Sequence, residues 1–428
     1  MLKCSRKNRH LWGVVFFACA FSLVSKGAIA ESSPEIDWSG FATLGVTYRD
    51  HHDLFFHRDY SLNADDEHFS VKSDSLLGLQ TNVQLSDEWD AMGQVVWQDS
   101  FDNDLANALQ WAFVRYRPNH NWVIRVGRIG LDLYMMSEYR NVDYAYIWSR
   151  PFTEFYGLTS SISRIDGADI SYFTALGEYD LELKLAYGSN EFKLQGADNP
   201  IMLSLDGNLA FTASLRNETM LWRFAIAKTS LTGESVENNI LIDALNQIPH
   251  PFWPAASDIA AGLVLDDRQV NYFALGFQYD SGPWLFQTEL GYTDSSWIYF
   301  QSNINGYGAL AYRYRDFTGF GAISHIENTE DAATVPPPSS LVQYLPPNFQ
   351  AQIDAIYDGT SMAVNSARVS QTGYSLGVRW DFYPKMALKL QWDYFLIDDS
   401  GSALWQRKTD IKGEQNVNLV SLNWNMVF

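Results

Sequence analysis

The feature that most constrains this chain is an alternation of apolar and polar residues that recurs along nearly its whole length. In the segment NVNLVSLNWNMVF, Val420, Leu422 and Trp424 share one parity, while Ser421 and Asn423 share the other. A period of two is typical of a β-strand with one apolar face and one face that meets water. Beyond residue 30 no continuous apolar run is long enough for a membrane helix, so such a chain enters a bilayer only as a closed barrel.

The alternating segments predict about sixteen strands, an even number that suits a membrane barrel with a water-filled interior. Several segments carry charges on the polar parity, such as Lys389 between Leu388 and Leu390. Because these charges cannot face lipid, we predict an all-β fold, a transmembrane antiparallel β-barrel. The predicted strands lie near residues 36–49, 70–85, 88–99, 107–118, 121–128, 165–177, 179–188, 207–217, 219–229, 269–280, 283–294, 304–314, 316–326, 370–383, 385–397 and 415–428.

The connections between these strands alternate between short and long. Short ones, such as GE at 177–178 and YPK at 383–385, are rich in residues that suit tight hairpins. Membrane barrels have short periplasmic turns and long external loops, so the alternation predicts the orientation of the chain. The long external stretches, completed by two shorter loops, are predicted at 50–68, 129–164, 189–206, 230–268, 327–369 and 398–414. Two of them, 230–268 and 327–369, are apolar enough to form short helices over the barrel mouth.

The first thirty residues have the three parts of a secretory signal peptide: a basic start, an apolar centre and a small-residue cleavage site before Glu31. A lipoprotein signal would need Cys19 as its acylated residue, but Phe16 and Phe17 suit that pattern poorly. We therefore predict Sec-type export to the periplasm, a signal peptide over 1–30 and one barrel domain over 31–428. Cleavage would remove both cysteines, so neither disulfides nor thiolate chemistry is expected.

Charge and aromatic content narrow the partners of the chain. The formal net charge is −20, which argues against nucleic acid as a partner. Aromatic residues make up 15% of the chain, and nine of them fall at the predicted periplasmic strand ends, where amphipathic rings settle at the membrane interface. Phe428 is one of these, so we expect it to anchor the last strand at that interface.

From WSGFATLGVTYR to Phe428 the sequence resembles the Gram-negative general porins, in pattern and order more than in residue identity. The hairpin WAFVRYRPNHNWVIRVGR, closed by Gly127 and Arg128, is similar to the one that precedes the constriction loop in that family. The resemblance implies an outer-membrane homotrimer whose third loop, here 129–164, folds into the lumen. It also implies that the β-barrel assembly machinery recognises the last strand through Trp424, Met426 and Phe428. The loop lacks the Pro-Glu-Phe-Gly-Gly turn of enteric porins, so the family's eyelet geometry does not carry over.

A porin sorts small hydrophilic solutes and ions by size and by the field across its narrowest ring. We predict that wall cations face acidic residues of the loop across this constriction. The alternative is that the acids lie on the solvated outer part of the loop, while the arginines pair with wall carboxylates. The predicted constriction residues are Arg49, Arg115, Arg125, Arg128, Arg379, Lys389, Asp132, Glu138, Asp143, Glu154 and Asp166, with Arg117 and Arg223 also pointing inward.

Two further groups of side chains have both a structural and a functional interpretation. Trp111 and Phe113 share the inward parity, where they would either stack on sugars or pack under the loop. Four histidines of the first loop lie among carboxylates, but their spacing matches no closed zinc pattern, so no metal or other cofactor is predicted. These weak metal candidates are His51, His52, His57 and His68. Carboxylates of the same loop could instead bridge to lipopolysaccharide through divalent cations.

The predicted function is passive diffusion of small hydrophilic solutes and ions through an outer-membrane channel that is not an enzyme. Ser324 and His325 are adjacent on a strand and point to opposite faces, so they cannot form a catalytic pair. One alternative is a porin selective for an anionic, sugar or aromatic nutrient. Another is an adhesin or phage receptor plugged by its own loops, which would pass no sugar in a liposome-swelling experiment.

Overall fold

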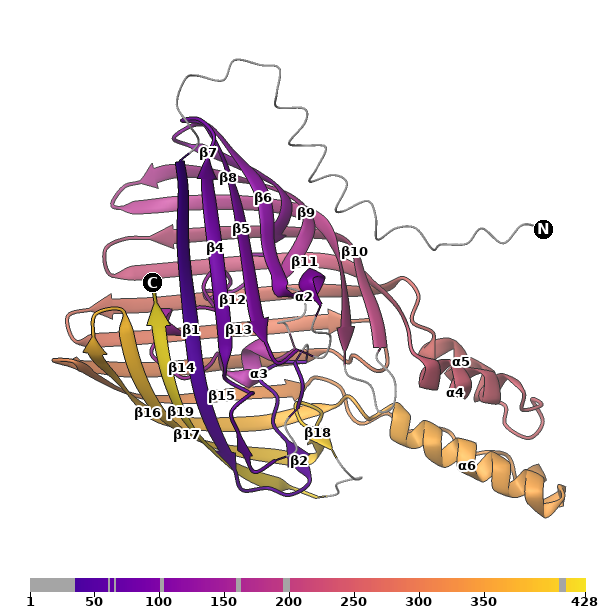
Figure 1. Cartoon of the computed structure of the whole chain (residues 1–428). Helices are drawn as coiled ribbons and strands as arrows, with labels where there is room; N and C mark the ends of the chain where they lie inside the picture. Colours follow the sequence, from indigo (N-terminus) through magenta and orange to yellow (C-terminus); the bar gives the residue numbers. More distant parts are fainter. Residues whose placement is uncertain are drawn as a thin grey trace.

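The computed structural model describes residues 35–60, 62–64, 67–100, 104–158, 163–194, 201–407 and 413–428. The predicted signal peptide, 1–30, lies outside them. The described residues form one antiparallel sheet that closes into a barrel where β1 (Glu35–Arg49) pairs with β19 (Gln415–Val427), as Figure 1 shows. Among these residues, no helix combines the length and the apolar character needed to cross a bilayer.

Within the described ranges the barrel wall has sixteen long strands, and each corresponds to one predicted strand. Two-residue pieces, β2 (Leu54–Phe55), β3 (Phe69–Ser70) and β18 (Gln406–Arg407), lie in the loops. The remaining long strands are β4 (Leu76–Gln84), β5 (Trp89–Gln98), β6 (Leu109–Asn119), β7 (Trp122–Gly130), β8 (Arg164–Leu176), β9 (Tyr179–Leu194), β10 (Ile201–Arg216), β11 (Met220–Glu234), β12 (Arg268–Ser281), β13 (Trp284–Ser295), β14 (Asn303–Tyr314), β15 (Phe317–Asn328), β16 (Val369–Tyr383) and β17 (Met386–Ser402).

The closing seam of the barrel includes Phe428. Its backbone N–H donates to the carbonyl of Gly40 at 2.9 Å, and the N–H of Gly40 donates back to the carbonyl of Phe428 at 3.0 Å. The ring of Phe428 covers Gly40 so closely that a Cβ there would lie 2.3 Å from the ring. Gly40 therefore makes room for the aromatic side chain that seals the first and last strands.

One predicted external loop is mostly strand. The stretch 189–206 was expected to be a loop, but β9 continues to Leu194 and β10 already begins at Ile201. The segment around Gly207 is a bulge inside β10, where the pairing shifts register and Gly207 adopts a φ of 61°. Beyond the bulge, Leu203, Leu205, Leu231 and Leu265 form a buried apolar cluster that stabilises the extended sheet.

The two faces of the wall differ as the alternation predicts. Outward side chains stay exposed in the isolated barrel, for example Leu44 at 60% and Leu290 at 60%, and these belong to the surface that meets lipid. Aromatic rings border this surface at the short-turn end, where Trp89 stacks on Tyr116 with ring centroids 4.4 Å apart. The predicted aromatic rings at the short-turn strand ends thus lie on the outer face of the barrel.

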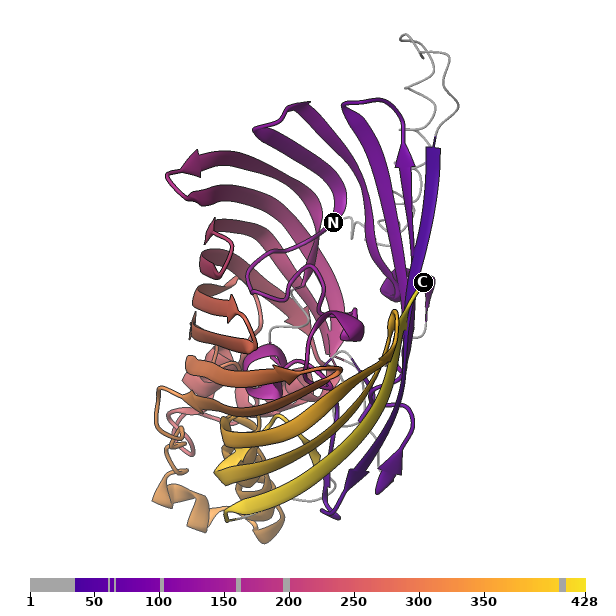
Figure 2. The same ribbon diagram turned by 90° about the vertical axis from the view of Figure 1, so that its left-hand side faces the viewer.

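The described part of the third loop, 131–158 and Ser163, is called loop 131–163 below; it folds into the lumen as predicted, and Figure 2 shows it inside the wall. It contains a short 3-10 helix, η2 (Asp143–Ala145), and one helical turn, α3 (Thr153–Tyr156). Its apolar side chains form the largest buried cluster with inward residues of the wall, most of them small or aromatic residues of β10 to β15. The loop is therefore packed against one side of the barrel.

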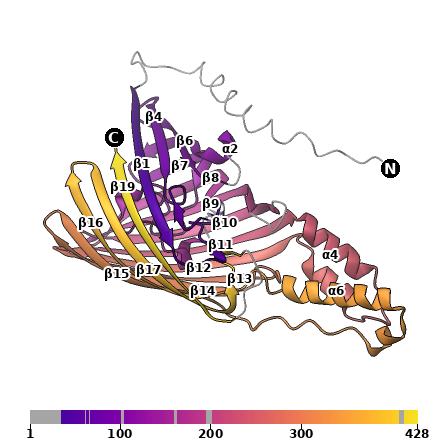
Figure 3. The ribbon, with the colours of Figure 1, turned by 60° about the horizontal axis from the view of Figure 1, so that its bottom comes forward.

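Helices form in the two apolar external loops, but they do not cover the barrel mouth. The helices α4 (Val236–Asn246), α5 (Ala256–Leu263) and α6 (Pro347–Ala363) project beyond the long-loop end, as Figures 1 and 3 show. They pack on one another around Trp253, which is 1% exposed and donates its ring N–H to Pro336. This shared core takes up the apolar side chains that we expected to lie over the barrel mouth. Two shorter elements are α2 (Leu105–Ala108) and η4 (Ser340–Tyr344).

Candidate functional site

The inward fold of loop 131–163 depends on one buried arginine that the sequence analysis missed. Arg150 donates to Asp74 through two bonds of 3.0 and 2.7 Å, to Asp393 on β17 at 3.0 Å, and to Ser421 on β19. Its guanidinium also lies 4.8 Å from the ring centroid of Phe56. Arg150 thus joins the third loop to the first loop and to the last two wall strands. It stands in no periodic pattern, so only the folded chain reveals its role.

Two predicted constriction cations bind the backbone of the loop instead of facing water. The ammonium of Lys389 donates to the carbonyls of Asp143 and Trp148, the latter at 2.8 Å, and the residue is 1% exposed. Arg379 donates to the carbonyls of Tyr144 and Tyr146 at 2.7 and 2.9 Å, and its other side pairs with Asp381. Both cations therefore hold the loop on the wall.

Asp132, at the start of the loop, lies between two wall cations. Its carboxylate accepts from Lys184 on β9 at 2.7 Å and from Arg223 on β11. Burial opposes ionisation of this carboxyl, but the charges of Arg223 and Lys184 outweigh it and lower the pKa of Asp132 to about 2. The group is thus a permanent anion that fixes the loop to the wall.

Glu154, on α3, is held by neutral side chains, and among the described residues no cation forms an ion pair with it. Gln371 and Ser324 donate to its carboxylate at 2.6 and 2.8 Å. Burial raises the pKa of Glu154, and these two hydrogen bonds oppose that shift only in part.

Several predicted constriction residues are buried and do not border the aqueous passage, which corrects the sequence-based assignment. Loop–wall packing encloses Asp132, Glu154 and Lys389, while Asp143 pairs with Arg58 of the first loop. Arg49 is 3% exposed, and its guanidinium lies 5.0 Å from the ring of Phe55. The strand parity identified the inward face correctly, but it could not show that the loop covers part of that face.

Arg128 and Asp166 lie on the outer face of the barrel wall. They are direct partners on β7 and β8, with hydrogen bonds of 2.7 and 2.9 Å. Arg128 shares its parity with Val126, which is 58% exposed on the outer face, and Asp166 shares its parity with Ile170. Asp166 also belongs to a strand and not to the loop. This pair therefore does not line the pore.

The remaining wall arginines pair with wall carboxylates. Asp90 on β5 accepts from Arg115 at 3.0 and 3.1 Å and also from Arg117, while Asp169 on β8 accepts from Arg125 at 3.0 Å. Asp90 stands directly opposite Arg115, and Asp169 directly opposite Arg125, in the strand register. The sequence analysis missed both acids, although pairing the predicted inward positions of neighbouring strands would have found them.

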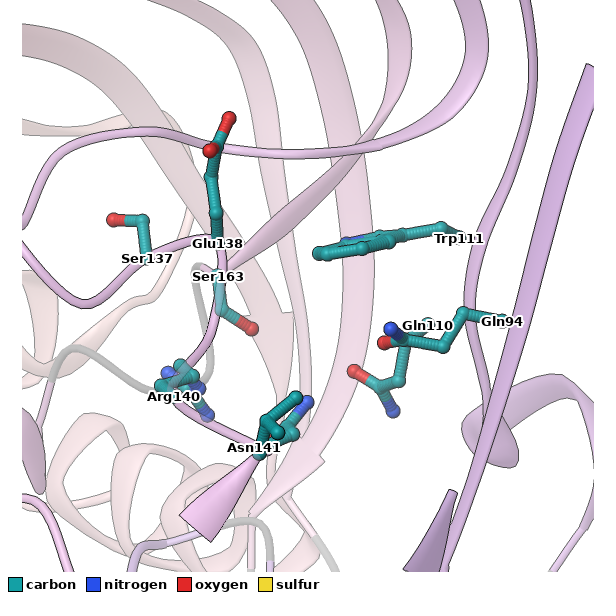
Figure 4. Close-up of a pocket in the computed structure, with 9 residues that line it drawn as sticks. Gln94, Gln110, Trp111, Ser137, Glu138, Arg140, Asn141 and Ser163 are labelled. Carbon is teal, nitrogen blue, oxygen red and sulfur yellow. The ribbon is translucent and has the colours of Figure 1, made fainter. Parts of the chain in front are cut away.

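A narrow gap separates the loop from the wall beside the packed cluster, where Trp111 borders both, and we call this gap the constriction. Figure 4 shows Gln94, Gln110 and Trp111 on the wall side of the gap, with the loop side chains across from them. Glu138 has a 60% exposed side chain. Phe113, in contrast, is 3% exposed within the cluster under the loop. Of the two predicted lumen aromatics, Trp111 therefore borders open space and Phe113 does not.

The histidines of the first loop are engaged separately. His57 is buried with its Nδ1 2.8 Å from the carbonyl of Asp59, and the Nδ1 of His51 accepts from two backbone N–H groups. His52 and His68 touch at 3.1 Å. In the described ranges, no group of three or more His, Cys, Asp or Glu residues has the geometry of a metal site. On β15, Ser324 faces the lumen toward Glu154, whereas His325 faces outward and bonds to Thr372.

A family model of Gram-negative porins matches residues 17–403, which is most of the chain. The chain belongs to this family. No curated protein matches the sequence of this porin. As members of the family do, the protein forms a water-filled channel for passive diffusion across the outer membrane, with its short turns on the periplasmic side.

Solved structures share the fold of this porin at low sequence identity. OmpF of Salmonella typhi, in complex with daunomycin, has a TM-score of 0.52 and 10% identity, covering 92% of this chain and 97% of that one. The outer membrane channel DcaP of Acinetobacter baumannii has a TM-score of 0.51 and 12% identity, covering 94% and 99%. A trimer form of OmpT from Vibrio cholerae has a TM-score of 0.50 and 11% identity, covering 93% and 100%. These similarities support the barrel fold.

Proposed function

We propose that solutes cross this porin along the β4–β9 side of the barrel and pass the constriction beside Trp111. The observation that carries this proposal is the asymmetric packing of loop 131–163. The loop buries mainly the inward face of β10 to β15, together with a few residues of β6 to β9 such as Phe113, whereas other inward side chains of β4 to β6, such as Gln80, Arg115 and Arg117, stay partly exposed. On that side, water and small hydrophilic solutes therefore meet polar wall side chains that the loop leaves partly uncovered.

The charges along this path are balanced, so we propose that ion selectivity is weak. Four cations meet four carboxylates in contacts within 4 Å. Because each charge has a close partner of opposite sign, the field that reaches a passing ion is small. The cations are Arg115, Arg117, Arg125 and Lys184, and the carboxylates are Asp90, Glu138, Asp169 and Glu182.

Removing one member of a pair should shift selectivity in a direction set by the charge that remains. Arg125→Ala leaves Asp169 uncompensated, so we expect a shift toward cations; Glu138→Gln should shift selectivity toward anions. A unit charge about 6 Å from the ion path contributes about 0.7 kcal/mol in water, which is about a threefold change in the permeability ratio. Reversal potentials in a KCl gradient across planar bilayers measure this ratio.

The control for this pair of variants is Lys228→Ala. Lys228 is an exposed cation on the outer parity of β11, shared with Trp222 and Phe224, so its removal should leave the reversal potential unchanged. If Arg125→Ala and Glu138→Gln behaved like Lys228→Ala, the proposed path along β4–β9 would be wrong.

We further propose that the porin is a homotrimer whose outer face contacts lipid and lipopolysaccharide. The trimer form of OmpT, which shares the barrel fold, supports the assembly state. Chemical cross-linking in native outer membranes, followed by denaturing electrophoresis, should give a ladder that stops at three subunits.

Transport needs no catalytic group, which agrees with the separation of Ser324 and His325 on opposite faces of β15.

The proposed signal for the β-barrel assembly machinery comprises Trp424, Met426 and Phe428. Phe428→Ala should reduce the amount of folded porin in the outer membrane several-fold and leave unfolded chains in the periplasm, because the variant loses the ring that covers Gly40. Quantitative blotting of membrane fractions measures this effect. Phe382→Ala is the matched control, since Phe382 is 40% exposed at the same end of β16 but is not in the last strand. If both variants lost the same amount of folded porin, Phe428 would contribute no more than any other aromatic residue at this interface.

A further inference from the structure

We infer that the constriction is a weak binding site for uncharged sugars, with the indole of Trp111 as its stacking surface. This inference rests on the proposed passage along β4–β9 and names the solute class that the passage retains longest. Figure 4 shows the indole reaching from the wall into the gap, with Ser163 and Glu138 on the loop side.

Part of the Trp111 ring surface lines the gap, where a solute can contact it. The residue packs on the apolar cluster under the loop through part of its surface and lines the gap with the rest. Within the described part of the chain its ring N–H makes no hydrogen bond. A pyranose presents a face of C–H groups that matches an indole in size and polarity, and its hydroxyl groups lie around the edge. Trp111 thus supplies the apolar half of a sugar site.

Two wall amides supply acceptors next to the indole. The NH₂ group of Gln94 donates to Gln80 at 2.8 Å, and that of Gln110 donates to the carbonyl of Asn107 at 3.0 Å. Each bond orients its amide through one of the two N–H donors and leaves the carbonyl oxygen for a sugar hydroxyl. Both residues line the gap beside Trp111. The polar half of the site is therefore uncharged on the wall side.

The loop side adds one buried donor that lacks a partner. Arg140 lines the gap, its Nη2 lies 3.6 Å from Asp59, and its Nη1 is buried without a hydrogen-bond partner in the described residues. An unsatisfied buried donor costs free energy, so a shift of the Arg140 side chain that brings this N–H to the gap would be favoured by pairing with a sugar hydroxyl oxygen. Asp59 offsets the charge of Arg140, and Glu138 lies close by, so a carboxylate ligand would meet repulsion.

The combination of one indole with uncharged amides favours binding of cyclic sugars over the other solute classes. A flat aromatic solute would stack on Trp111 but would desolvate Gln94 and Gln110 without pairing them, which is unfavourable. A linear polyol would pair with the amides but lacks a flat face for the ring. An uncharged cyclic sugar satisfies both parts of the site.

The test is sugar-induced current noise of the purified full-length porin in planar bilayers. Maltotriose should produce a saturable reduction of the KCl current, and sorbitol, a linear polyol, should not. Trp111→Ala should raise the half-saturating concentration of maltotriose about fivefold to tenfold, and Trp111→Phe about twofold, the range expected for loss of a stacked ring. Gln110→Met keeps the shape of the side chain and should raise the same concentration about threefold.

The matched control is Trp97→Ala, which removes an indole that is 45% exposed on the lipid face of the neighbouring strand β5. It should leave the sugar titration unchanged. Equal half-saturating concentrations in the wild type and Trp111→Ala would overturn the sugar site, as would tighter binding of galacturonate or of a neutral aromatic solute than of maltotriose. In all of these outcomes the KCl conductance persists, whereas its absence would instead contradict the proposed passage.

Discussion

Replacing Arg150 with methionine should lower the free energy of unfolding of this porin by about 3–5 kcal/mol, the usual effect of removing one partner from a buried ion pair. Arg150 is 3% exposed, and Asp74 and Asp393 at its sides are 0% and 3% exposed. Without the guanidinium both carboxylates stay buried without a cation in contact. Thermal unfolding followed by circular dichroism in detergent measures the loss.

The same substitution should also disturb the channel. Arg150 fixes loop 131–163 to Asp74, Asp393 and Ser421, so its loss should free the loop and increase both conductance and open-channel noise. Protease digestion should cut the loop in the variant and spare it in the wild type.

Two comparison variants distinguish the effect of breaking the buried ion pairs from the effect of losing any arginine side chain. Arg313→Met removes a wall cation whose pair with Asp280 is 36% and 38% exposed, so it should cost less than about 1 kcal/mol. Combining Arg150→Met with Asp74→Asn and Asp393→Asn removes the stranded charges and should restore much of the stability. If Arg150→Met were no more harmful than Arg313→Met, Arg150 would not be the anchor of the loop.

Introducing arginine at position 79 should impair folding, whereas arginine at position 80 should be tolerated. Leu79 on β4 is 37% exposed on the outer face, so an arginine there must enter lipid. We expect Leu79→Arg to lower the free energy of unfolding by about 2–4 kcal/mol, the range measured for a cation near the bilayer midplane. Unfolding by guanidinium chloride in lipid vesicles measures this effect.

Gln80→Arg is the matched variant, since the two residues are adjacent but Gln80 faces the lumen and bonds to Gln94. It should fold with near wild-type stability and shift the reversal potential toward anions by about threefold in permeability ratio. Equal destabilisation at positions 79 and 80 would contradict the assignment of the two faces of β4.

The strands could be predicted because a strand that meets lipid on one side and water on the other must alternate, and each segment of this chain does so locally. The errors occur where this constraint ends. In β10, Gly207 looks like a turn between Asp206 and Asn208, but the sheet continues beyond the membrane and absorbs the glycine as a bulge. Above the bilayer no lipid enforces a strict alternation, so the sequence pattern carries less information there.

The candidate site was predicted less well, for a related reason. Parity identified Arg115, Arg125 and Lys389 as inward residues, but the role of each depends on its neighbours in space. Arg115 and Arg125 meet wall carboxylates in register, whereas Lys389 meets carbonyls of a loop that lies more than two hundred residues away in sequence. Trp111 borders the gap and Phe113, two residues later, is buried, although the two share one parity.

The sequence by itself determined the barrel, its strand order, its lipid-facing surface and the inward course of the third loop, because these follow from local alternation, turn chemistry and family resemblance. Only the tertiary structure decided which inward residues border water. That choice depends on which side of the barrel the loop packs against, and contacts such as those of Arg150 with Asp74 and Asp393 join residues distant in sequence. Long-range packing of this kind leaves no period in the sequence, so the path of the solute becomes visible only when the chain is folded.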